Sequence, residues 1–234
     1  SDELPRHYLL TNIKGVFGST MSEFVFCYLL MHEKKALSRY ASQQQNQWDE
    51  ISPGFLAGKT IGIMGVGSIG CHIAQTAKYF GMNTKGVTRS KRDCQSIDHY
   101  NHLNQIMEFV GDLDYLVSVL PHTPQTNELI DNIVLAAMKK QAVIVNVGRG
   151  NVIQEEALIQ ALNKGKLAAA VLDVFQEEPL PVNHPFWNTR NLLVTSHTAA
   201  PSIPEDVALV FCENYHIFRR GDPLNYRVDF EQGY

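Results

Sequence analysis

The stretch that decides the fold is Thr60-Ile61-Gly62-Ile63-Met64-Gly65-Val66-Gly67-Ser68-Ile69-Gly70. Residues 60–64 form a short apolar run that predicts a buried strand. Residues 68–80 carry Ile69, Ile73, Ala74 and Ala77 at helical spacing and predict a helix. A glycine-rich turn joins the two. The stretch therefore predicts a strand–turn–helix unit, which is the building block of an α/β fold.

The same alternation continues along the chain. Nearly continuous apolar runs predict parallel strands buried on both faces, at 84–88, 115–120, 142–147, 168–174 and 192–196. Segments with helical spacing lie between them, at 103–109, 132–138 and 154–163. Strand alternating with helix predicts right-handed crossovers and a doubly wound parallel sheet. Two flanks fall outside this pattern: an apolar helix at 20–37 with a polar surface loop at 43–48, and a final helix at 204–218.

Composition excludes several classes of protein. Of the 234 residues, 44% are hydrophobic and 19% charged, as in a globular domain with a real core. A formal charge of -4 argues against a nucleic-acid partner. No apolar run approaches the roughly 18–20 residues of a membrane span, and the first residues lack the order of a signal peptide, so we expect a cytoplasmic location. The scattered cysteines, without a Cys-x-x-Cys pair, predict free thiols: Cys27, Cys71, Cys94 and Cys212.

The glycine-rich turn predicts a phosphate site. In this context Gly65 permits the tight turn, Gly67 permits close approach of the backbone to a pyrophosphate, and Gly70 permits close packing of helix on strand. The helix start at Ser68 and Ile69 offers unpaired N–H groups and the positive end of its dipole. We therefore expect this turn to bind a dinucleotide.

The tip of the second predicted strand indicates which dinucleotide. An NAD site usually carries Asp or Glu about 20 residues after the turn, to bind the ribose hydroxyls. Here the strand ends Thr88-Arg89-Ser90, without a carboxylate, and these side chains could donate hydrogen bonds to a 2′-phosphate. A solvated basic turn is the alternative reading. The tip favours NADPH, with NADH also possible.

Three reactive side chains follow three predicted strands. Arg149 comes after the strand at 142–147, an acidic residue (Glu177 or Glu178) after 168–174, and His197 after 192–196. Ligands bind open α/β sheets beyond the carboxyl ends of the strands, so we expect the three to face one crevice. They suit hydride transfer to a 2-oxoacid: the guanidinium holds the substrate, the imidazole donates a proton, and the carboxylate orients the imidazole.

Motifs spread over most of the chain carry a family resemblance. They are Gly65-Val66-Gly67-Ser68-Ile69-Gly70, Leu120-Pro121-His122-Thr123-Pro124-Gln125-Thr126, Asn146-Val147-Gly148-Arg149-Gly150, Leu172-Asp173-Val174-Phe175-Gln176-Glu177-Glu178-Pro179-Leu180-Pro181 and His197-Thr198-Ala199-Ala200. In these stretches and their order the chain resembles the D-isomer-specific 2-hydroxyacid dehydrogenases, and among them the glyoxylate/hydroxypyruvate reductase branch.

The resemblance implies roles for individual residues. Arg149, Glu178 and His197 would be the catalytic set, Glu178 being selected over Glu177 because it directly precedes a proline. Asp173 would contact the nicotinamide carboxamide. Further cofactor contacts are implied in the matching motifs, at Leu120, Pro121, His122, Thr126, Val147 and Ala199. The end at Thr88, Arg89 and Ser90 resembles that of NADP-using members.

The resemblance also implies an organisation. Residues 1–14 would be the end of a flavodoxin-like substrate domain and the crossing from it, 15–199 the dinucleotide-binding domain, and 200–234 the return to the substrate domain. Most of that domain would be missing, so the chain should bind cofactor better than it turns over substrate. Members are typically homodimers, with the segment at 20–48 in the interface.

The expected activity is NADPH-dependent reduction of a small 2-oxoacid. The alternative is a dinucleotide-sensing interaction protein of the same family without turnover. We expect no metal at Asp98, His99 and His102, because no third ligand stands at convincing spacing.

Overall fold

The computed structural model describes residues 8–88 and 93–230, which fall into two compact units. The larger unit runs from Gly18 to Ala200, and the smaller combines the residues up to Phe17 with those from Pro201 onward. The assignment of the smaller unit to a substrate domain stays a prediction.

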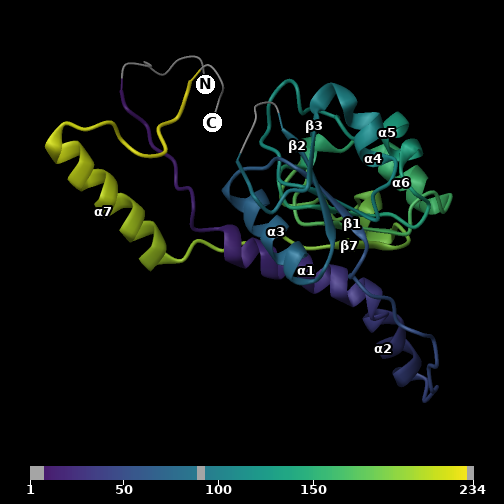
Figure 1. The fold of residues 1–234 in the computed structure, drawn as a ribbon. Coiled ribbons are helices and arrows are strands. Elements are labelled where there is room, and N and C mark those ends of the chain that lie inside the picture. Colours follow the sequence, from purple (N-terminus) through teal and green to yellow (C-terminus); the bar gives the residue numbers. More distant parts are fainter. Residues whose placement is uncertain (1–7, 89–92, 231–234) are drawn as a thin grey trace. The chain divides into compact units, whose positions relative to one another are not determined.

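The larger unit is built on a seven-stranded parallel sheet in the order β3-β2-β1-β4-β5-β6-β7 (Figure 1). The strands are β1 (Thr60–Met64), β2 (Asn83–Thr88), β3 (His99–His102), β4 (Tyr115–Ser118), β5 (Val143–Asn146), β6 (Ala169–Leu172) and β7 (Leu192–Val194). Because β1 pairs with both β2 and β4, the chain winds outward from β1 in two directions. The predicted parallel α/β sheet is confirmed.

Helices cover both faces of this sheet (Figure 1). On one face lie α1 (Gly18–Glu33) and α3 (Ser68–Tyr79); on the other lie α4 (Ile106–Val110), α5 (Asn132–Ala137) and α6 (Glu155–Asn163). Each face has its own apolar core, since alternate residues of a strand point to opposite sides. Short 3₁₀ helices are η1 (Leu103–Gln105), η2 (Gly150–Val152) and η3 (Pro185–Asn188).

Two sequence expectations need correction. The sequence predicts no strand between 88 and 103, yet strand β3 lies there and pairs with β2 at the edge of the sheet. An edge strand is not buried on both sides like a central one, so it lacks the continuous apolar run by which the other strands were found. The helix expected at 20–37 is also two helices: α1 ends at Glu33, Lys35 adopts a left-handed φ of 55°, and α2 (Ala36–Gln44) begins there. The loop expected at 43–48 therefore begins within α2.

The smaller unit consists of α7 (Pro204–Arg220) and the extended segments beside it. An antiparallel bridge joins Thr11 to Arg227, and the Asn12 amide donates to the Tyr226 carbonyl at 2.9 Å. Asn214 of α7 fixes the returning chain, because its side chain donates to the Asn225 carbonyl and accepts from the Asn225 amide. No helix in the described part of the chain is both long enough and apolar enough to cross a membrane.

A buried carboxylate ties α1 to the amino-terminal edge of the sheet. Glu33, the last residue of α1, is 3% exposed. Its Oε1 accepts from Lys59 Nζ at 2.6 Å and from the Tyr115 hydroxyl. Lys59 directly precedes β1 and Tyr115 opens β4. Burial alone would raise the pKa of Glu33, but the hydrogen bonds from Lys59 and Tyr115 and the lysine charge outweigh it, so the pKa lies below its usual value.

The variant Glu33→Gln should be less stable at neutral pH by about 1–3 kcal/mol, because the Lys59 ammonium loses its charged acceptor. A group with a lowered folded-state pKa stabilises the fold above its unfolded pKa, and this stability is lost as pH falls through the folded pKa. The difference in free energy of unfolding between wild type and variant should therefore shrink below pH 4.5. Urea titrations at several pH values measure it.

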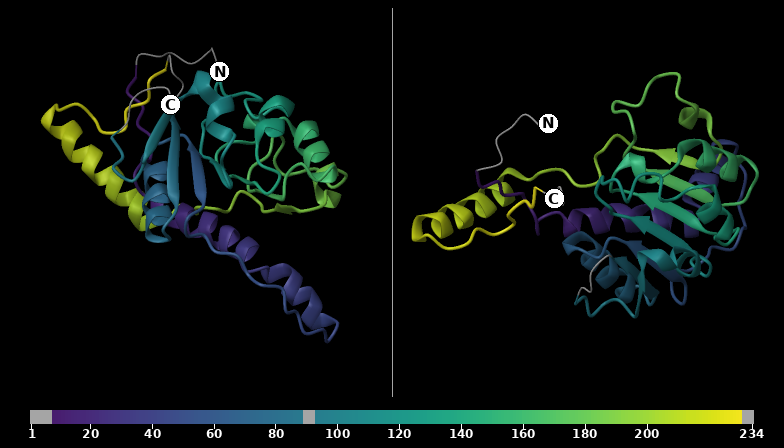
Figure 2. Two further views of the ribbon diagram at one scale, coloured as in Figure 1. Left: turned by 45° about the vertical axis from the view of Figure 1, so that its right-hand side comes forward. Right: turned by 90° about the horizontal axis from the view of Figure 1, so that it is seen from above.

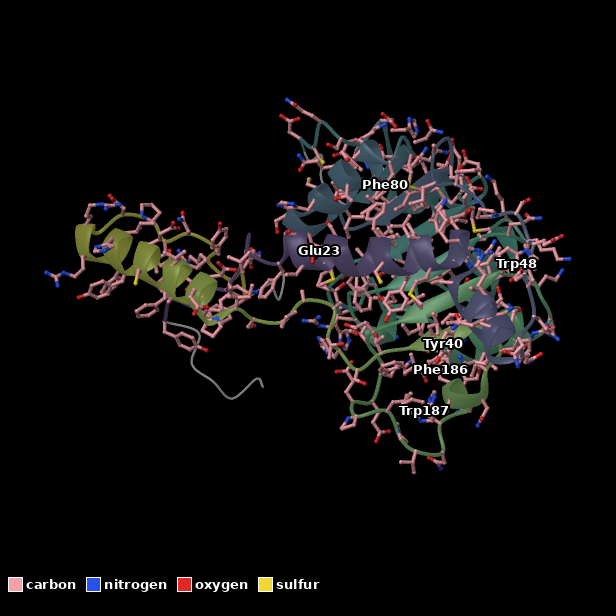
Figure 3. The ribbon with its side chains drawn as sticks, turned by 90° about the horizontal axis from the view of Figure 1, so that it is seen from below. Glu23, Tyr40, Trp48, Phe80, Phe186 and Trp187 are labelled. Carbon is pink, nitrogen blue, oxygen red and sulfur yellow. The ribbon has the colours of Figure 1, made fainter. Side chains whose placement is uncertain are left out.

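The matched control is Glu23→Gln, an exposed carboxylate on the same helix (Figure 3). It should leave the stability within about 0.5 kcal/mol. Equal effects of the two variants would contradict the role of the Glu33 anchor.

Candidate functional site

The candidate site lies where the carboxyl ends of three neighbouring strands meet. β5, β6 and β7 are consecutive in the sheet and in register, with Asn146 beside Leu172 and Leu172 beside Val194. Arg149 lies in the segment that leaves β5, Glu178 in the segment that leaves β6, and His197 in the segment that leaves β7. The topology thus brings three side chains to one edge of the sheet, although the first, Arg149, and the last, His197, are 48 residues apart in sequence.

His197 and Glu178 form a direct pair. The imidazole Nδ1 and the carboxylate Oε2 are 2.7 Å apart, and Glu178 Oε1 accepts from the Phe175 amide at 2.9 Å. Both carboxylate oxygens are therefore engaged, which fixes the orientation of the carboxylate and, through it, that of the imidazole. An Nδ1–H held by a carboxylate leaves Nε2 as the ring nitrogen that can exchange a proton with a ligand.

The charge state of Glu178 follows from its neighbours. Partial burial would raise its pKa, but the hydrogen bond from His197, the amide of Phe175 and the charges of His197 and Arg149 together lower it below the usual value. Glu178 is thus ionised at neutral pH. An ionised carboxylate is an acceptor only, so it fits the role of hydrogen-bond acceptor for the His197 Nδ1–H.

Arg149 is presented on a short turn held by Asn146. The Asn146 side chain accepts from the Gly148 amide at 3.2 Å and donates to the Arg149 carbonyl at 2.9 Å. Gly150 lies against the end of β6, where an added Cβ would stand 1.9 Å from the carbonyl carbon of Phe175. Only glycine permits this approach, and it brings the Arg149 turn beside the segment that leads to Glu178. The guanidinium is exposed, with Nη1 donating to the Gly148 carbonyl at 2.7 Å.

The glycine-rich turn has the geometry that a pyrophosphate requires. Gly65 adopts φ +98°, and its amide donates to the Val87 carbonyl at 3.1 Å, which joins the turn to the end of β2. A Cβ added at Gly67 would meet nothing within 4 Å, so there is open space where a phosphate would approach. Within the described residues no side chain caps α3, and its first N–H groups can donate to a ligand. The turn thus fits a dinucleotide.

The other predicted cofactor residues have varied surroundings. Thr88 is the last residue of β2, whereas Arg89 and Ser90 lie outside the described residues. Leu120, Pro121 and His122 follow β4, Val147 and Ala199 are buried, and Thr126 is buried within its own turn. The Thr126 hydroxyl donates to the Pro121 carbonyl at 2.7 Å and accepts from the Thr123 amide at 2.9 Å. Its role in cofactor binding stays a prediction.

Two residues of the site were missed at the level of sequence. Asn146 shapes the Arg149 turn, and Thr195 donates its hydroxyl to Asp173 at 2.6 Å. Each is the last but one residue of a predicted apolar strand, where a polar residue is a usable signal of a capped turn. Among the described residues, no three His, Cys, Asp or Glu side chains lie close enough to hold a metal ion, and this includes Asp98, His99 and His102.

Comparison with known proteins places the chain in context. The profile described as D-isomer specific 2-hydroxyacid dehydrogenase, NAD binding domain, matches residues 26–199. Glyoxylate/hydroxypyruvate reductase A of Serratia proteamaculans is 32% identical over 214 residues, which are 92% of this chain and 68% of that protein.

Solved structures agree with this match. A D-isomer specific 2-hydroxyacid dehydrogenase family protein from Aeromonas salmonicida has a TM-score of 0.92 and 43% identity, covering 97% of this chain and 74% of that one. NADPH-dependent glyoxylate/hydroxypyruvate reductase from Sinorhizobium meliloti, in complex with NADP and sulfate, has a TM-score of 0.91 and 30% identity, covering 99% and 74%. With its parallel sheet, its glycine-rich turn and these matches, the chain belongs to the D-isomer specific 2-hydroxyacid dehydrogenase family.

Proposed function

We propose that the protein reduces a small 2-oxoacid, of the glyoxylate or hydroxypyruvate kind, to the 2-hydroxyacid with NADPH. The observation that carries the proposal is the 2.7 Å pair of His197 and Glu178, with Arg149 close enough to lower the pKa of that glutamate. The pair stands at the carboxyl edge of the sheet, the edge to which the glycine-rich turn also belongs. The names of the relatives from Serratia proteamaculans and Sinorhizobium meliloti support the substrate class.

Each residue has one task in this reaction. The bound cofactor supplies the hydride that adds to the carbonyl carbon. Arg149 holds the substrate through paired N–H donors, which match a carboxylate or a carboxylate and its adjacent carbonyl. His197 gives the proton from Nε2 to the carbonyl oxygen, so that oxoacid, hydride and proton together make the hydroxyacid. Glu178 stays ionised, keeps the imidazole oriented and stabilises its positive charge.

The preference for NADPH rests on the tip of β2 together with one relative. Thr88-Arg89-Ser90 offers hydroxyl and guanidinium donors and no carboxylate that would repel a 2′-phosphate. The Sinorhizobium meliloti enzyme was crystallised with NADP. Since the chain shares the family fold with that enzyme, we extend the same cofactor class to it.

We also propose a homodimer formed through an arm, defined as residues 36–55. Figure 1 and the left view of Figure 2 show α2 extending away from the sheet and its covering helices. The arm exposes large apolar side chains, Tyr40 and Trp48 among them (Figure 3). At its base lies a groove of about 920 Å³, lined by residues of α1, β6 and β7 such as Tyr28, Ala170 and Leu193, and by arm residues such as Leu37 and Pro53. An exposed apolar arm with a groove at its base supports a two-fold interface in which the arm of each protomer packs on its partner.

The variant His197→Ala should lower kcat for glyoxylate and hydroxypyruvate by about 10²–10⁴-fold, because the proton donor is lost. Its dissociation constant for NADPH should stay within about twofold, since the phosphate turn is unchanged. Glu178→Gln should lower kcat as well, because a neutral amide stabilises the imidazolium less. NADPH oxidation at 340 nm and fluorescence titration of NADPH measure the two quantities.

His99→Ala, at the exposed start of β3, is the matched control and should keep the wild-type kcat. The assay uses the full-length protein. Tight binding of NADPH without turnover of any 2-oxoacid would reject the reductase and favour a sensor of the dinucleotide.

The variant Arg89→Ala should raise KM for NADPH by about tenfold, the worth of one charged hydrogen bond, and leave KM for NADH unchanged. The ratio of kcat/KM for the two cofactors measures the preference. An unaltered ratio would show that Arg89 does not bind the 2′-phosphate.

Replacement of Trp48 by Glu should shift the protein from dimer to monomer in light scattering, because a charge would be buried in the interface. Trp48 is 89% exposed in the chain, and Tyr79 on α3, at 87%, is the matched control. Tyr79→Glu should leave the mass unchanged. A monomeric wild type, or equal effects of both variants, would contradict the arm interface.

A further inference from the structure

Asp173 is the most completely enclosed carboxylate at the candidate site. It follows β6 directly and is 1% exposed. Its Oδ1 accepts from the Thr195 hydroxyl at 2.6 Å and from the Thr198 amide at 2.9 Å, and its Oδ2 accepts from the Ala199 amide at 2.9 Å. A carboxylate has roughly four acceptor positions, so these donors use most of its capacity.

All three donors belong to a single turn, residues 195–199, and His197 stands at its centre. The backbone of Asp173 contributes a fourth bond, because its carbonyl accepts from the His197 amide at 2.7 Å. His197 itself adopts a left-handed φ of 55°, which is uncommon for a residue other than glycine and needs support from its surroundings. A single residue, Asp173, thus bonds to the turn both before and after His197, the residue with the left-handed backbone.

We infer that Asp173 is a positioning residue, whose buried carboxylate clamps the 195–199 turn so that the His197 imidazole faces Glu178. The inference deepens the proposed reductase function and rests on it for the consequence in turnover. It assigns to Asp173 a task within the protein, in addition to the carboxamide contact that the family resemblance implies.

The clamp requires a carboxylate in particular. Two backbone amides and one hydroxyl donate to it, and no donor group on the residue itself could be accommodated between them. In Asp173→Asn the amide NH₂ would oppose the amide of Thr198 or Ala199, donor against donor. The turn would have to move, and the imidazole would move with it. Thr195→Val tests the same clamp more gently, because it removes a single hydroxyl donor and leaves the amides of Thr198 and Ala199 as donors to the carboxylate.

The experiment combines two readouts on the full-length protein. Amide hydrogen exchange of Thr198 and Ala199, followed by NMR, reports whether the clamp is closed. Steady-state kinetics with glyoxylate and NADPH report whether the imidazole still supports turnover. Fluorescence titration gives the NADPH dissociation constant. Thr195→Val and Asp173→Asn should speed both amide exchanges and lower kcat at least about tenfold, with a smaller change in KM.

Two further variants make the test specific. Thr195→Ser keeps a hydroxyl and should restore most of the protection and of kcat. Thr189→Val removes a buried hydroxyl that donates to the Pro185 carbonyl in the neighbouring loop, and it should change neither readout. The NADPH dissociation constant of Thr195→Val should stay at the wild-type value.

The outcomes separate the inference from the function on which it rests. Unchanged exchange at Thr198 and Ala199 in Thr195→Val overturns the clamp, whatever the kinetics. Faster amide exchange with an unchanged kcat overturns the positioning role of Asp173. A loss of NADPH affinity in Asp173→Asn, together with a wild-type kcat in Thr195→Val, also overturns that role. A wild type without turnover rejects the proposed function alone, because the exchange of the two amides still decides whether Asp173 holds the turn.

Discussion

Parallel pairing of β5, β6 and β7 is the constraint on which the candidate site depends. Because all three strands run in the same direction and lie side by side, their carboxyl ends form one edge, and whatever follows each strand is brought to that edge. Arg149, Glu178 and His197 lie in separate parts of the sequence. Strand pairing brings them together, because each lies within a few residues of the carboxyl end of its own strand. The crossover helices fill the faces of the sheet and keep the edge free.

Pairing alone gives proximity, and the loops convert it into geometry through buried polar side chains. Asn146 satisfies two backbone groups of the Arg149 turn, and Asp173 satisfies three donors of the His197 turn. A buried amide or carboxylate with its partners in place leaves few alternative arrangements, because any other one would strand a polar group away from water. Loops of this kind are as well defined as the strands that carry them.

The central strands and the glycine-rich turn could be predicted because they have local signatures: continuous apolar runs and glycines at fixed spacing. Strand β3 could not, since an edge strand has no such run, and neither could the break at Lys35, where a single left-handed residue divides an apolar stretch. Arg149 and His197 were predicted from their place after a strand. Glu178 was separated from Glu177 only by family likeness, and the structure supplies the reason that spacing lacked: Glu178 accepts from both His197 and Phe175.

The ion pair of Glu33 and Lys59 lies at the opposite edge of the sheet from the candidate site, since Lys59 precedes β1 and Tyr115 begins β4. The full length of each strand separates the two, and neither group of residues contacts the other's loops in the hydrogen bonds described. Substitutions that adapt the protein to acidic or warm surroundings can therefore accumulate at one edge while selection for turnover acts on the other. In this fold, substitutions that change stability at the amino-terminal edge and substitutions that change substrate range at the carboxyl edge fall on different residues.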